Sequence, residues 1–151
     1  MYKKIDSIIL NGNVHEDIQS QFNIAKNLFV YSWYVYSFNN IAELKAISTL
    51  EFTLRTVLNK KRLGLKKLLI YAIENDLIID SRLHEEEDDF LDYKYSCKEK
   101  ENIDLKKQTK YVVNYITSHR NNLAHGSTTL TIPSPDIFEI TADFINQLFK
   151  Q

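Results

Sequence analysis

Apolar residues recur at three- and four-residue spacing through most of this chain, which is the pattern of amphipathic helices. Five stretches carry that pattern and are predicted as helices: 15–39, 41–60, 65–76, 102–124 and 136–149. Only three glycines and two prolines interrupt the chain, which favours long helices over a turn-rich β fold. We therefore predict an all-α bundle of four to five helices, forming a single domain over 1–151.

The first predicted helix differs from the others because its second half is apolar on nearly every side. Phe22, Ala25 and Phe29 form a regular stripe, which Trp33 and Tyr36 extend. A helix that is apolar all round belongs in the centre of a bundle or in a subunit interface. The pair Asn39–Asn40 is expected to end this helix, and Asn40 to cap the next one.

Charge is distributed unevenly along the chain. Residues 80–101 hold nine acidic and four basic side chains, so this connector carries −5 and is expected to be the least ordered part. Since the whole chain carries −1, the remainder carries +4, and a surface that faces RNA is compatible with it. The lone Cys97 excludes an intramolecular disulfide and fits a reducing cytoplasm. No stretch reaches the ~18 apolar residues of a membrane span.

Candidate chemistry is concentrated at the end of the fourth predicted helix, in the string Arg120-Asn121-Asn122-Leu123-Ala124-His125-Gly126. An arginine can hold a phosphate through two parallel N–H bonds. Histidine is the side chain best suited to move protons near neutral pH. Gly126 is the residue expected just beyond a helix end. Together these groups suffice for phosphodiester cleavage without a metal or cofactor.

This string resembles the R-x4-6-H signature of the HEPN superfamily (higher eukaryote and prokaryote nucleotide-binding domains). The run from Ala46 to Arg55 is also similar to the family's second helix, though such a pattern is common in amphipathic helices. The resemblance implies a HEPN-like bundle and a metal-independent endoribonuclease of toxin–antitoxin or phage-defence systems. It also implies an RNA substrate, a homodimer with a site built between two protomers, and an antitoxin or regulatory partner protein.

Helix geometry bears on how the signature works. Asn121 and His125 are four residues apart and about 40° around the axis, so both can project to one side. Arg120 and His125 are about 140° apart and do not share a face. The arginine could curl round, the helix could unwind at His125, or two signatures could meet across a two-fold axis.

Simpler interpretations stand beside this one. His125 before a glycine can merely cap its helix, and Arg120 can serve the helix dipole. A HEPN-like domain can also bind a nucleotide, RNA or a partner without catalysis, and a helical scaffold would use its aromatic first helix only to assemble. His119 is expected to be an ordinary surface or core-edge histidine, with a second proton carrier as the alternative.

Two further groups of charged residues each allow two interpretations. Glu51 is expected to pair with Arg55 on one helix face, and the alternative is that it holds Arg120 or His125. Five basic residues form a corner around the second helix end: Lys60, Lys61, Arg62, Lys66 and Lys67. A solvated helix end is favoured for this corner over binding of the phosphate backbone.

Overall fold

The computed structural model describes residues 2–79, 105–127, 129 and 132–150, and within these ranges it contains helices and no strand. The described helices are α1 (Tyr2–Ser7), α2 (Glu16–Tyr31), α3 (Phe38–Val57), α4 (Leu65–Glu74), α5 (Leu105–Ala124) and α6 (Asp136–Leu148). The predicted all-α bundle is confirmed. The connector 80–101 lies outside the described residues.

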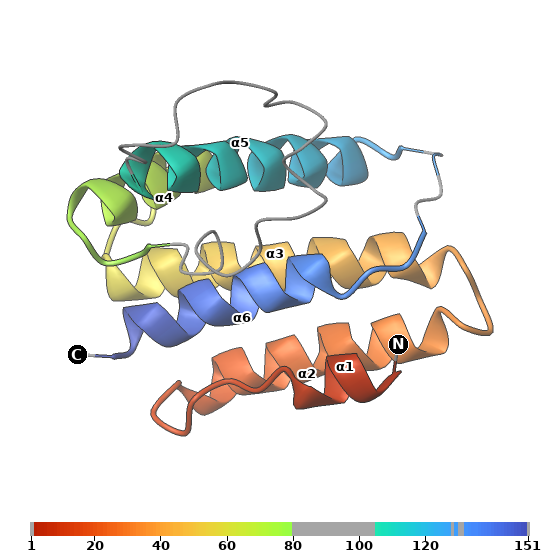
Figure 1. The fold of residues 1–151 in the computed structure, drawn as a ribbon. Helices are drawn as coiled ribbons and strands as arrows, with labels where there is room; N and C mark the ends of the chain where they lie inside the picture. The colour runs from red at the N-terminus through yellow and green to blue at the C-terminus, as the bar shows by residue number, and fades with distance from the viewer. Residues whose placement is uncertain (1, 80–104, 128, 130–131, 151) are drawn as a thin grey trace, which may run out of the picture.

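Helix α3 is central to the bundle. It packs against α2, α4, α5 and α6, and Figure 1 shows α2 on one side of it and α5 antiparallel on the other. Its fully buried apolar residues include Ala46, Ile47 and Leu50. Because α3 is surrounded, two of its carboxylates, Glu43 and Glu51, are also buried. Buried carboxylates require polar partners, and side chains of both α3 and α5 supply them.

The prediction for the first long helix was wrong at its end. Helix α2 stops at Tyr31, and residues 32–37 form turns in place of the expected helix to residue 39. Trp33 and Tyr36, expected in the centre of the bundle or in a subunit interface, are 71% and 42% exposed in the single chain. The run is apolar at nearly every position, so its spacing does not distinguish a helix from a turn. The hydroxyl of Ser32 donates to the Phe29 carbonyl at 2.6 Å, which helps to end the helix.

Two more boundaries differ from the prediction. Helix α3 begins at Phe38, so Asn40 lies inside its first turn and donates to the Thr129 carbonyl at 3.3 Å instead of capping the helix. The helix ends at Val57, because Asn59 adopts a left-handed φ of 52° that asparagine tolerates. The short α1 was not predicted, since six residues hold too few apolar positions to show a period.

Candidate active site

The signature lies at the carboxyl end of α5, and this end has a well-defined stop. Helix α5 ends at Ala124, and Gly126 has a left-handed φ of 77°. The Gly126 N–H donates to the Leu123 carbonyl at 3.2 Å, and the Ser127 N–H donates to the Asn122 carbonyl at 3.1 Å. These two bonds form a Schellman motif. The expectation that Gly126 terminates the helix is therefore confirmed, and His125 is fixed directly before it.

Replacing Gly126 with alanine is expected to lower the free energy of unfolding by about 1–2 kcal/mol, because a Cβ disfavours the left-handed conformation. No atom would contact the new Cβ, so the effect comes from the backbone alone. Gly12→Ala is the matched control, since Gly12 also has open space around it and lacks a left-handed φ. Urea denaturation of both variants measures the difference. Equal stabilities would contradict the assigned strain.

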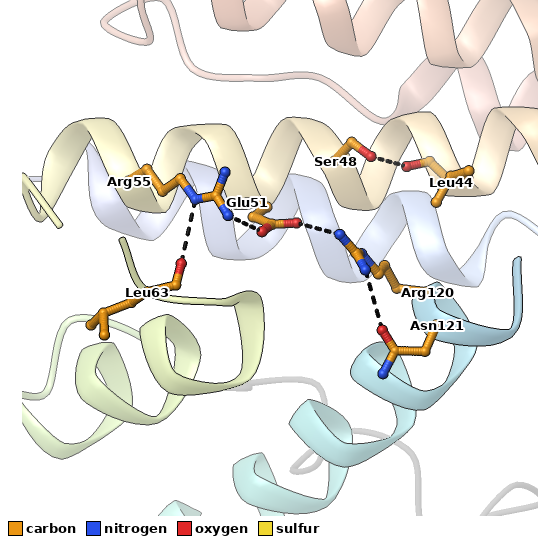
Figure 2. Close-up of polar contacts among 7 residues, drawn as sticks. All are labelled: Leu44, Ser48, Glu51, Arg55, Leu63, Arg120 and Asn121. Carbon is orange, nitrogen blue, oxygen red and sulfur yellow. Dashed lines mark hydrogen bonds and ion pairs between the residues drawn. The ribbon is translucent and has the colours of Figure 1, made fainter. Parts of the chain in front are cut away.

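Arg120 reaches from α5 to α3, where it meets a buried carboxylate. Its Nη2 lies 3.4 Å from Oε2 of Glu51, and Oε1 of the same glutamate accepts from Nη2 of Arg55 at 2.5 Å (Figure 2). Glu51 is only 7% exposed. The structure thus shows both of the contacts considered for Glu51: the pair with Arg55 and the contact with Arg120. One buried carboxylate orients two guanidinium groups.

Asn121 contacts the arginine rather than the histidine. Its Oδ1 accepts from Nη1 of Arg120 at 3.3 Å, so the two terminal nitrogens of Arg120 are directed to Asn121 and Glu51 (Figure 2). Among the described residues, the buried Nε of Arg120 has no hydrogen-bond acceptor. The guanidinium is therefore held in place from two sides and retains an unused donor.

His125 is exposed, and within the described ranges its side chain makes no hydrogen bond or ion pair. Its backbone N–H still donates to the Asn121 carbonyl at 3.0 Å, which is the regular helical bond. The helical conformation therefore continues through His125. The side chains of Arg120 and His125 keep their separation of about 140° around the helix axis. Arg120 curls toward α3, and the structure shows no contact between the two side chains. A single chain does not bring Arg120 and His125 together.

His119 belongs to a second cluster that the sequence did not reveal. Its Nε2 lies 2.6 Å from Oε2 of Glu43, and Oε1 of Glu43 accepts from Nδ2 of Asn39 at 3.0 Å. Tyr115 stacks on the His119 ring, and burial, with Glu43 and then Asp136, raises the pKa of Tyr115. His119 is thus a core-edge histidine, as expected. The sequence signal that could have indicated this cluster was the spacing of Glu43 and Glu51, which share one face of α3.

The five residues of the basic corner lie in different environments. Lys60 lies over the Tyr71 ring, 4.5 Å from its centroid. Lys61 is exposed and agrees with a solvated helix end. Arg62, Lys66 and Lys67 line a pocket that Arg120 and Asn121 also line. The second helix was predicted to run to residue 60, but α3 ends at Val57, so Lys60, Lys61 and Arg62 lie beyond the helix.

Comparisons with known proteins were made for the whole chain. No family model, curated protein or solved structure matches it. The expected resemblance to HEPN domains therefore rests on sequence alone, that is, on the string from Arg120 to Gly126 and on the run from Ala46 to Arg55. In the described ranges, every helix is too short or too polar to cross a bilayer.

Proposed function

We propose that this protein is a metal-independent endoribonuclease of the HEPN type, with an active site completed by two copies of the chain. One observation carries the proposal. Arg120 is held toward α3 by Glu51, whereas His125 lies exposed and without a side-chain partner among the described residues. An oriented cation and a free imidazole on different faces of one helix end suit a cleft between two protomers.

The proposed reaction is transesterification within the RNA strand. His125 of one protomer accepts the proton of a ribose 2′-OH, whose oxygen attacks the adjacent phosphorus. The bond from phosphorus to the 5′-oxygen breaks, and the protonated His125 donates its proton to that oxygen. The arginine of this site comes from the other protomer. Arg120 binds the phosphate and stabilises its developing negative charge. Asn121 adds a hydrogen bond to the phosphate, and Glu51 acts as a positioning residue for Arg120.

The biological setting follows from the resemblance alone. A HEPN-type ribonuclease of this kind fits a toxin–antitoxin or phage-defence system in the cytoplasm, held in check by an antitoxin or other regulatory partner. A second function, a non-catalytic module that binds a nucleotide or RNA, is favoured by one observation. The pocket beside Arg120 is lined by basic side chains, and His125 does not line it.

The direct test is incubation of the purified protein with single-stranded RNA in excess EDTA. We expect cleavage to continue, because the proposed reaction uses only protein groups. The products should carry a 2′,3′-cyclic phosphate and a 5′-OH, which end-group labelling and mass spectrometry identify. Loss of cleavage in EDTA, or products with a 5′-phosphate, would contradict the mechanism. Binding of RNA without any cleavage would favour the second function.

A further inference from the structure

A pocket of about 490 Å³ lies where the end of α3, the start of α4 and one face of α5 meet. Five cationic side chains line it: Arg55, Arg62, Lys66, Lys67 and Arg120. Of the described residues that line it, only Glu51 carries a carboxylate. A concave site with this excess of positive charge concentrates anions in its neighbourhood.

The single carboxylate does not neutralise this charge. Glu51 already pairs with Arg55 at 2.5 Å and with Arg120 at 3.4 Å. Arg62, Lys66 and Lys67 make no ion pair within the described part of the chain. Three cations of the pocket therefore have no acidic partner among the described residues and can pair with an incoming ligand.

The start of α4 strengthens this preference for an anion. Lys66 and Lys67 lie in the first turn of the helix, where the helix dipole favours acidic side chains and disfavours lysine. Gly64 precedes the helix and provides no side-chain cap, and Gly64 and Leu65 both line the pocket, so the uncapped start of α4 borders it. Local sequence that opposes the helix dipole in this way is expected where a bound anion compensates.

The lining also indicates which anion fits. The described residues that line the pocket include no aromatic side chain, so they offer no ring on which a base could stack. Asn121 contributes an amide whose N–H groups can donate to phosphate oxygens. The Thr117 hydroxyl donates to the Val113 carbonyl at 2.7 Å, so its oxygen can accept from a ribose hydroxyl. The volume and polarity suit a segment of sugar–phosphate backbone better than a nucleobase.

We infer that this pocket is a second phosphate subsite, which binds the backbone of the RNA strand next to the phosphate that is cleaved. The inference rests on the proposed function, because Arg120 and Asn121 belong to both places. Arg120 connects them, with Glu51 holding the guanidinium at the pocket wall. Lys66, Lys67 and Arg62 fix the strand by charge, independently of its sequence.

The test measures RNA binding by the wild-type protein without cleavage. The probe is a fluorescent single-stranded RNA of about ten nucleotides, with 2′-O-methyl riboses that cannot attack their phosphates. Fluorescence anisotropy at several salt concentrations gives the slope of log K against log [salt]. Each phosphate contact contributes about −0.7 to that slope for a single strand. We expect Lys66→Gln/Lys67→Gln to reduce the slope by about 1.4 and to weaken binding about tenfold or more at low salt.

Lys3→Gln/Lys150→Gln removes the same charge from two exposed lysines outside the pocket, and should leave the slope unchanged. Equal effects of the two double variants, or no binding by the wild type, would overturn the subsite. The EDTA assay separates this result from the proposed function. Cleavage with an unchanged slope rejects the pocket alone, whereas a reduced slope without cleavage rejects the chemistry and retains the pocket.

Discussion

His125→Ala is expected to lower the rate of RNA cleavage by about 10²–10⁴-fold, the usual contribution of a general acid or base. In the proposed site His125 serves both proton transfers, so one substitution removes the base and the acid together. The side chain is exposed and makes no contact within the described ranges. Stability should therefore change by no more than about 0.5 kcal/mol. Initial rates on a fluorogenic RNA, with thermal melts of both proteins, measure the two effects.

Asn122→Ala is the matched control for this experiment. Asn122 is exposed on the same last turn of α5, and its contribution to the Schellman motif comes from its backbone carbonyl. Its substitution should leave the cleavage rate within about twofold of the wild type, since only surface polarity changes. If His125→Ala cleaves as fast as Asn122→Ala, the histidine has no role in proton transfer.

Mixing two inactive variants is expected to restore activity. Arg120→Ala should be inactive alone, because loss of a charge-stabilising donor costs about 10²–10³-fold. It should still fold, since Glu51 keeps Arg55 as a partner. In a mixed dimer with His125→Ala, one of the two composite sites regains an intact arginine and an intact histidine. Random exchange of protomers then restores about a quarter of the wild-type rate.

Restoration depends on exchange between protomers, so the variants are mixed after co-expression or after unfolding and refolding together. Rates are compared with those of each variant treated in the same way. Activity that stays at the level of the single variants would assign Arg120 and His125 to separate sites. A cleavage-competent monomer in sedimentation analysis would contradict the composite site more directly.

Much of the fold was predictable because it depends on local pattern. The apolar spacing within α6 and the backbone freedom of Gly126 act over a few residues, and both the helix and its stop occur as predicted. The turn at 32–37 was not predictable in this way, because a run of apolar residues satisfies a helix and a turn equally well.

The contacts within the candidate site depend on packing between helices that are far apart in the sequence. The sequence therefore identified the residues of the site better than it identified their contacts. Glu51 and Arg120 are separated by 69 positions, and they meet because α5 packs antiparallel on α3 (Figure 1). The same packing joins His119 to Glu43. Spacing within one helix shows which residues share a face, but it does not say which helix covers that face.

The exposed turn before α3 provides a practical consequence. Trp33 is the chain's single tryptophan and is 71% exposed. The turn leads into the amino-terminal end of α3 (Figure 1). There Asn40 donates to the carbonyl of Thr129, which follows the signature in the sequence. Indole emission depends on the polarity around the ring. The unlabelled protein therefore contains its own fluorescent reporter at this end. A blue shift as the protein concentration is raised, or as RNA is added, would record that the ring becomes covered.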